Sequence, residues 1–261
     1  MLSISKFSQL TGICRSTLIY YDEIGLFAPA SRGTNNYRYY SHQQIITVNL
    51  INVMRDLDVP VKVIRELVRK RTPQSISVLL AEQERELKKK IHWLRDTQNI
   101  ILTLHTLLES GMAADESRIS VCETDKLRII LGPENDFGDG SSFYNGFLIF
   151  CAQAKAQGVN LNYPIGGYFD DINVFLGEPS RPTRFFFINP EGSEQKPAGR
   201  YLTGYTRGYY GQTNDLPERM KAYARRHKLV MEGPVYNIYL FDEISISDPN
   251  RYLLQVTVRV V

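Results

Sequence analysis

The chain has 261 residues, of which 43% are hydrophobic and 23% charged, and its net charge is +3. This length favours two compact units over one, and the lack of any apolar run near the roughly 20 residues that span a bilayer argues against a membrane partner. Its three widely separated cysteines form neither a disulfide framework nor a CxxC zinc site, and the N-terminus has no secretory pattern, so we expect a cytoplasmic protein.

The excess positive charge is confined to the first part of the chain. Residues 1–80 carry ten Lys or Arg against five Asp or Glu, residues 81–118 carry six against seven, and residues 119–261 carry fifteen against sixteen. The first segment therefore has the charge that attracts nucleic-acid phosphates, although the excess is modest.

The first two predicted elements are short helices separated by a glycine turn. Apolar residues recur at helical spacing over residues 4–10 and Gly12 follows them. A second helix over Arg15–Glu23 places Leu18 and Tyr21 on its inner side. This pair is compatible with a helix-turn-helix, although the spacing alone is weak evidence for one.

A wing and two further helices are predicted next. Ser31–Tyr40 runs through a turn-rich Gly, Thr, Asn, Asn segment into YRYY, which predicts a short hairpin. Ser41 and Gln44 have the spacing of a capping box at the start of a third helix. Pro60 ends this region, and a fourth short helix follows.

The segments ISKFSQLTG, STLIYYDEIGLF, YRYY and DVPVKVIREL, in this order, resemble the DNA-binding domain of the MerR family of regulators. The resemblance implies a winged helix-turn-helix domain over residues 1–75, with the second helix in the major groove of double-stranded promoter DNA. Wing and fourth-helix cations would contact phosphate. The residues expected to contact DNA are Arg15, Ser16, Thr17, Tyr20, Tyr21, Arg38, Tyr39 and Lys62.

Two positions depart from the family pattern, and one contact has a competing interpretation. Ile19 stands where the family usually has an arginine, so one charge-assisted phosphate contact should be missing. Cys14 replaces the usual capping serine, and a thiol is a poor N-cap acceptor; a packing role for Cys14 is favoured over a redox role. The spacing of Tyr21 also favours a place in the core, whereas Tyr20 faces the other way.

Residues 76–111 are predicted to form one long helix that mediates dimerisation. Residues 76–110 contain no proline or glycine, and Gly111 is expected to close the helix. Its apolar heptad stripe favours a coiled-coil homodimer over a lone surface helix, and the resemblance implies an antiparallel pair. Cysteine ligands at the helix ends are too few for a metal site. The stripe consists of Leu80, Leu87, Leu94, Ile101 and Leu108.

The segment 119–261 reads twice as strand, helix, strand, strand, so the whole chain is predicted to be α+β with an internal duplication. PIGGYFDD, GRYLTGYTRG and GPVYNIYLF resemble the GyrI-like effector-binding domain of the multidrug-sensor type, in which two such halves enclose a ligand cleft. The predicted elements are Lys126–Leu131, Ser141–Gln157, Ile165–Phe175, Thr183–Ile188, Arg200–Tyr209, Leu216–His227, Val235–Phe241 and Tyr252–Val261.

Aromatic and amide side chains are the candidates for effector contact. The multidrug sensors carry acids at the positions of Asn237 and Gln255, and an amide cannot supply the same charge pairing, which puts selection for cations in doubt. Both amides have the alternative role of satisfying buried backbone groups. The candidate effector contacts are Tyr163, Tyr168, Phe185, Phe187, Asn237, Tyr239 and Gln255.

The resemblance implies a transcription activator that responds to a small molecule. A homodimer would hold promoter DNA, distort it when an aromatic or lipophilic effector binds, and so realign the promoter for RNA polymerase. No cofactor, metal or catalytic residue is expected, because no carboxylate stands at the two amide positions to act as a general base. The alternatives are a ligand-modifying enzyme and an architectural DNA binder that ignores ligands.

Overall fold

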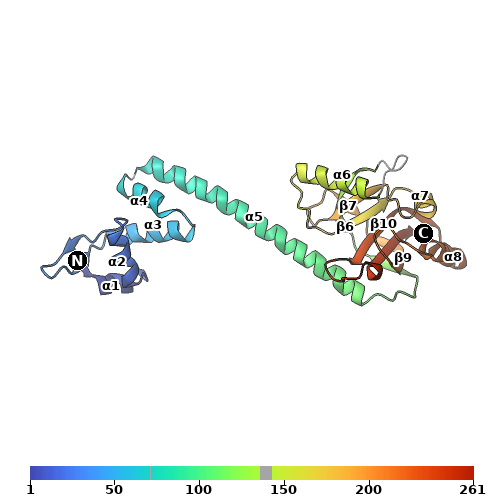
Figure 1. Ribbon diagram of the computed structural model, residues 1–261, viewed down its shortest axis with the longest axis horizontal. Helices are drawn as coiled ribbons and strands as arrows, with labels where there is room; N and C mark the ends of the chain where they lie inside the picture. Colours follow the sequence, from blue (N-terminus) through green and yellow to red (C-terminus); the bar gives the residue numbers. More distant parts are fainter. Residues whose placement is uncertain (71, 136–142) are drawn as a thin grey trace. The chain divides into compact units, whose positions relative to one another are not determined.

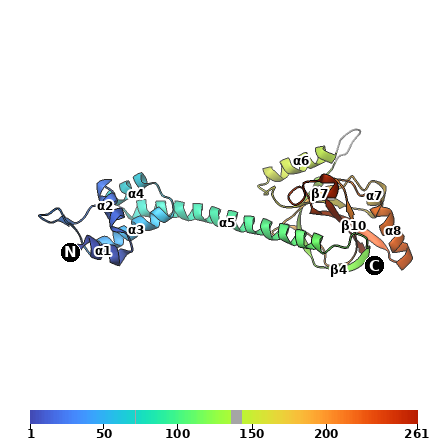
Figure 2. The same cartoon turned by 60° about the horizontal axis from the view of Figure 1, so that its bottom comes forward.

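The computed structural model describes residues 1–70, 72–135 and 143–261, and mixes helices and strands (Figures 1 and 2). The chain forms two compact units, Met1–His92 and Trp93–Val261. The long helix α5 (Pro73–Met112) contributes residues to both. Within the described residues, no helix is long and apolar enough to cross a membrane, and no group of three or more His, Cys, Asp or Glu side chains is placed to hold a metal ion.

The first unit contains the predicted helices and wing. Its three-stranded sheet has the order β1-β3-β2. Ser41 and Gln44 form the predicted reciprocal cap, because Gln44 N donates to Ser41 Oγ (3.3 Å) and Ser41 N donates to Gln44 Oε1 (2.9 Å). The elements are β1 (Leu2–Ser3), α1 (Ile4–Thr11), α2 (Arg15–Glu23), β2 (Ser31–Arg32), β3 (Arg38–Tyr40), α3 (Gln44–Asp56) and α4 (Val61–Arg69).

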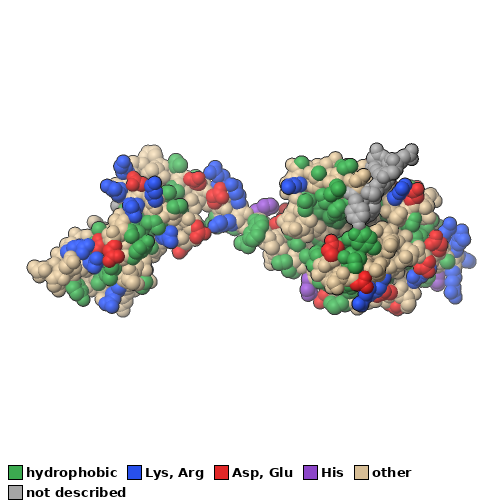
Figure 3. Space-filling model, in the orientation of Figure 1, with side chains coloured by type: hydrophobic (Ala, Val, Ile, Leu, Met, Phe, Trp, Pro, Cys, Tyr) green, Lys and Arg blue, Asp and Glu red, His purple; other side chains and the backbone are tan. Residues whose placement is uncertain are grey.

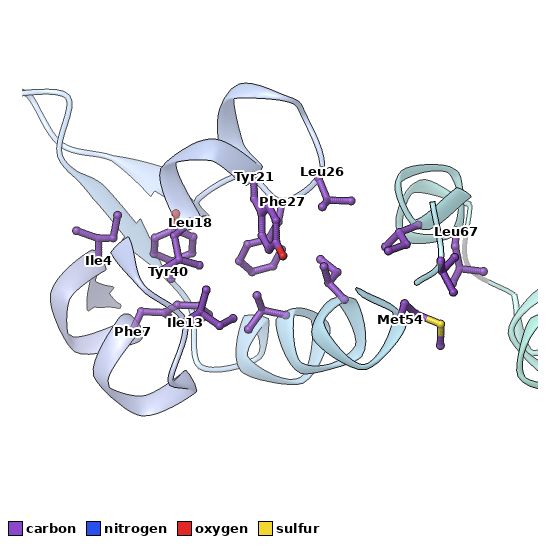
Figure 4. Close-up of a cluster of buried hydrophobic side chains, with 14 of the residues drawn as sticks. Ile4, Phe7, Ile13, Leu18, Tyr21, Leu26, Phe27, Tyr40, Met54 and Leu67 are labelled. Carbon is purple, nitrogen blue, oxygen red and sulfur yellow. The ribbon is translucent and has the colours of Figure 1, made fainter. Parts of the chain in front are cut away.

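The wing is anchored in the core of this unit by its last residue (Figure 4). The Tyr40 ring is fully buried and stacks on Phe7, with ring centroids 4.5 Å apart, and on Phe27, at 5.7 Å. Leu18 and Tyr21 of α2 belong to the same buried cluster. The hairpin and α2 therefore share one core, which positions the wing beside the second helix.

Helix α5 is longer than predicted, because it begins at Pro73 and ends at Met112. The expectation that Gly111 closes the helix is wrong: Gly111 lies inside it. A Cβ at this position would be 2.6 Å from Cε1 of Phe241, so the glycine allows the helix to approach that ring. Several heptad residues remain exposed, among them Leu80 and Leu94, with relative exposures of 45% and 57%.

The second unit is built on an antiparallel sheet of eight strands in the order β4-β9-β11-β10-β6-β7-β5-β8. Its strands are β4 (Ser120–Thr124), β5 (Leu127–Glu134), β6 (Ile165–Phe169), β7 (Arg184–Ile188), β8 (Glu194–Lys196), β9 (Gly199–Arg207), β10 (Met231–Phe241) and β11 (Leu253–Val260). Its helices are α6 (Phe143–Ala156), α7 (Ile172–Gly177) and α8 (Leu216–His227), and a 3-10 turn, η1, spans Pro249–Arg251.

The sheet order reflects the repeated element order. The runs β5-α6-β6-β7 and β9-α8-β10-β11 meet at the β6–β10 pair. Outward from this pair the strands follow in the order β6, β7, β5 on one side and β10, β11, β9 on the other, which is the same order within each run. The registers that join Val256, Asn237, Gly167 and Phe185 put their side chains on one face, where α6 and α8 also pack. The centre of that sheet face therefore lies where the two runs meet.

The predicted strand Ile165–Phe175 is wrong beyond Phe169. Asp171 caps a helix there: its carboxylate accepts a hydrogen bond from the backbone N–H of Asn173 at 2.6 Å, and α7 follows. Two short strands, β4 and β8, were not predicted.

Candidate DNA interface and effector cavity

A hollow on the first unit lies between the second helix and the wing. It has a volume of about 620 Å³, and it brings together Arg15, Ser16 and Arg38 from the predicted contact set. Lys and Arg side chains are spread over the visible face of this unit (Figure 3). The lining residues are Ile4, Arg15, Ser16, Ile19, Asn36, Tyr37 and Arg38.

The wing cations are oriented by one buried carboxylate at the end of α2. Asp22 Oδ2 accepts hydrogen bonds from Arg38 Nε at 2.6 Å and from Arg32 Nη2 at 2.5 Å, and the Asp22 side chain is only 6% exposed. The bond to Nε uses one of the five donors of the Arg38 guanidinium. Asp22 therefore holds the Arg38 guanidinium through Nε.

The other predicted DNA-contact residues have different surroundings. Tyr20 is 52% exposed, whereas Tyr21 is 6% exposed and belongs to the core, as its helical spacing predicted. Lys62 is exposed on α4, and Tyr39 is half-buried on β3 with its ring 6.4 Å from that of Tyr37. None of these lines the hollow.

Cys14 is the N-cap of α2, and its thiol makes no cap hydrogen bond to the helix backbone. Its Sγ lies 2.9 Å from Thr17 Oγ1 and 3.2 Å from Ser16 Oγ. Hydrogen bonds from Ser16 and Thr17 lower the pKa of this exposed thiol to about 7. The hydroxyls of two predicted DNA-contact residues, Ser16 and Thr17, are therefore hydrogen-bonded to the Cys14 thiol.

The second unit holds a cavity of about 560 Å³ at the centre of the sheet face, a size typical of small-molecule sites. Asn237 and Tyr239 of β10 and Gly167 of β6 form part of it. Apolar and aromatic side chains supply much of the remaining wall, including Ile100, Leu104, Phe147, Tyr163, Phe185, Leu254 and Ile244. Loop residues that also line the cavity include Tyr209, Tyr210, Gly211, Asp242 and Glu243.

Four of the seven candidate effector residues line this cavity, namely Tyr163, Phe185, Asn237 and Tyr239. Phe187 shares their sheet face but stacks on Phe150 of α6, with centroids 4.6 Å apart, so α6 covers it.

Tyr168 and Gln255 point to the opposite face of the sheet. The registers pair Asn237 with Gly167 and Val256, so their chain neighbours Tyr168 and Gln255 face the other way. Tyr168 packs edge-on to Tyr236 at 5.5 Å, and Gln255 Nε2 donates to the Tyr205 hydroxyl at 3.3 Å.

Acceptors dominate the polar lining of the cavity. Asn237 is 8% exposed, and its Oδ1 is buried without a hydrogen-bond partner among the described residues. The Glu243 carboxylate accepts a hydrogen bond from the Tyr210 hydroxyl, and burial raises the pKa of Asp242. No Lys or Arg is among the described residues that line the cavity.

Residues from loops and from α5 were missed by the sequence argument, which followed only the strands. Tyr209 and Tyr210 lie between β9 and α8, and Asp242 and Glu243 follow β10. No period in the sequence marked these residues, because a loop lacks the alternation that places strand side chains on one face.

Comparisons with known proteins place these features in a family. Residues 2–71 match the model described as MerR HTH family regulatory protein. The multidrug-efflux transporter 2 regulator of Bacillus subtilis (strain 168) is 30% identical over 260 residues, 96% of this chain and 94% of that protein. The multidrug-efflux transporter 1 regulator of the same strain is 27% identical over 141 residues, 51% of this chain and 50% of that protein.

One solved structure similar to this chain is the cryo-EM structure of the EcmrR-DNA complex in EcmrR-RPo, at 17% identity and a TM-score of 0.39, covering 99% of this chain and 98% of that one. The winged helix-turn-helix and the similarity over nearly the whole chain to a transcription regulator agree with each other. The chain belongs to the MerR family of transcriptional regulators, which bind DNA, and it is a regulator and not an enzyme.

Proposed function

We propose that the protein is a ligand-responsive regulator, acting as an activator, that distorts promoter DNA when a small molecule occupies the cavity of the second unit. The observation that carries this proposal is that Ile100 and Leu104 of α5 line the cavity. Helix α5 begins at Pro73, directly after the DNA-binding elements, so a ligand touches the helix that leads to them. A ligand regulates only if it has different affinities for two states of the protein.

A hydrogen-bonded contact ties the cavity wall to the same helix. The Tyr163 hydroxyl donates to Asp96 Oδ1 at 2.7 Å, and Asn160 Nδ2 donates to Asp96 Oδ2 at 2.6 Å. Burial and the Asp96 carboxylate both raise the pKa of Tyr163, so it remains a neutral donor. A ligand that moves Tyr163 would therefore also shift Asp96 of α5, because the two side chains are hydrogen-bonded.

The GyrI-like interpretation and the effector class rest on this cavity. Its aromatic lining suits flat, lipophilic molecules, and the Asp242 and Glu243 carboxylates favour a positive charge. The B. subtilis relatives are named as regulators of multidrug-efflux transporters, which agrees with an effector of drug-like character.

The proposed dimer forms along the exposed apolar stripe of α5. Leu87, Leu94 and Ile101 are 43%, 57% and 60% exposed in the single chain, and a second copy would remove them from water. Sedimentation should show a dimer that Leu94→Glu weakens. The matched change Val78→Glu, outside the stripe at an exposed position, should leave the dimer intact. A monomeric parent protein would contradict this part of the proposal.

The proposed DNA contacts are Arg15, Ser16, Thr17, Tyr20, Arg38, Tyr39 and Lys62. RNA polymerase is the expected partner at the promoter. Arg38→Ala should weaken binding to all sequences and lower the salt slope of the binding constant by about one unit. An unchanged slope would remove Arg38 from the phosphate contacts.

Promoter distortion is measured by resonance energy transfer between dyes at the two ends of a promoter fragment. A saturating concentration of an aromatic cation should change the transfer efficiency on DNA-bound protein. If no ligand that binds in the cavity changes either the DNA affinity or the transfer efficiency, the protein is a ligand-independent architectural binder.

A further inference from the structure

The polar groups of the cavity offer hydrogen-bond acceptors and few donors. At the sheet, Asn237 is 8% exposed, and its Oδ1 is buried with no hydrogen-bond partner among the described residues. At the loops, Asp242 and Glu243 add carboxylate oxygens. An unpaired buried acceptor is costly, so a bound ligand that donates to it gains that free energy.

Three tyrosine hydroxyls of the cavity lining already donate to protein acceptors. The Tyr239 hydroxyl donates to the backbone oxygen of Tyr209 at 3.2 Å and accepts from Gly211 N at 2.9 Å. The hydroxyl of Tyr163 donates to Asp96, and that of Tyr210 donates to Glu243. Two further polar side chains of the described lining, Asn162 and Ser180, are exposed to solvent.

Resting on the proposed function, we propose that the effector is an aromatic cation with at least one N–H, a protonated amine or amidinium, which donates to Asn237 Oδ1. Its rings would lie against Phe147, Phe185 and Tyr210, which line the same cavity. A quaternary cation has the charge but no donor, so it leaves Asn237 Oδ1 desolvated and unpaired. An anionic aromatic would meet two carboxylates, and the described residues of the lining include no Lys or Arg to pair with it.

The test is calorimetric titration of the full chain with one aromatic scaffold in four states of N-methylation. The probes are 4-phenylbenzylamine and its mono-, di- and trimethyl derivatives, all cationic at pH 7. Primary, secondary and tertiary amines retain an N–H, so their affinities should differ little. The trimethyl derivative should bind about tenfold or more weakly, the usual cost of one buried unpaired acceptor.

Two variants locate the effect. Asn237→Leu should abolish the tenfold drop between the dimethyl and trimethyl probes, whereas Gln255→Leu, an amide on the opposite sheet face, should retain it. The inference is overturned by a gradual decline across the series, by equal binding of all four probes, or by a drop that persists in Asn237→Leu. If the probes bind without this N–H preference, the proposed sensor function survives and only the inference fails. If neither these probes nor neutral 4-phenylbenzyl alcohol binds, both fail.

Discussion

Asp22→Asn tests whether one buried carboxylate positions the wing for DNA. The substitution keeps the shape of the side chain but removes the charge that Arg32 and Arg38 share at 2.5 and 2.6 Å. A hydrogen bond to a charged group contributes about 1.5–3 kcal/mol when shielded. The Arg38 side chain is 21% exposed, and Arg32, at 41%, is discounted for solvent screening. We therefore expect a loss of about 2 kcal/mol in urea unfolding of the first unit.

DNA binding separates two opposing effects of the same substitution. Removal of a negative charge near phosphates should by itself strengthen binding, most at low salt. Loss of wing positioning should weaken DNA binding. We expect this second effect to be the larger, so the Kd measured by fluorescence-anisotropy titration should rise several-fold. Asp58→Asn is the control, since Asp58 is 84% exposed and its left-handed backbone (φ 59°) suits asparagine. Tighter binding by Asp22→Asn, equal to that of Asp58→Asn, would refute the positioning role.

Three further predictions concern packing and titration. Gly166→Ala should destabilise the second unit by about 1–3 kcal/mol in chemical denaturation, because a Cβ would lie 2.6 Å from the Asn237 backbone oxygen. In Gly167→Ala the nearest contact of the new Cβ is at 3.1 Å, so this variant should keep the stability of the fold and narrow the cavity. Burial lowers the pKa of Lys196 to about 8, so below pH 8 the folded state holds a buried charge that is solvated in the unfolded state. Lys196→Met should therefore raise the free energy of unfolding by on the order of 2 kcal/mol at pH 7, and this gain should shrink as the pH rises from 8 to 10.5. The alkylation rate of Cys14 should rise with pH to half its maximum near pH 7, and Cys151, whose pKa burial raises, should require higher pH; equal profiles in a mass-spectrometric assay would contradict both assignments.

The elements with strong local signals were predictable from the sequence. Helix α8 spans Leu216–His227, the range its amphipathic spacing predicted, and the capping pair Ser41 and Gln44 forms as expected. Strand β8 (Glu194–Lys196) was not predicted because its three residues are all polar and show no alternation of apolar and polar side chains. Gly111 was misassigned because a glycine near a helix end resembles a cap, and only the tertiary contact with Phe241 reveals the other role.

The cavity was partly predictable, for a reason specific to sheets. Alternation within a strand correctly grouped Phe185 with Phe187, but it says nothing about which face neighbouring strands share. Cross-strand register decided that Tyr168 and Gln255 lie opposite Asn237, and long-range packing of α6 covered Phe187. The Asp242 and Glu243 carboxylates of the cavity lining come from a loop, where the sequence has no hydrophobic period.

The central claim, that occupancy of the cavity controls transcription, is tested most directly by run-off transcription from the promoter of the protein's own gene with purified RNA polymerase. Saturating 4-phenylbenzylamine should raise the amount of transcript made with the parent protein, and Asn237→Leu should require at least about tenfold more amine for the same effect. Equal transcript with and without saturating amine, under conditions where calorimetry shows the cavity to be filled, would contradict the account.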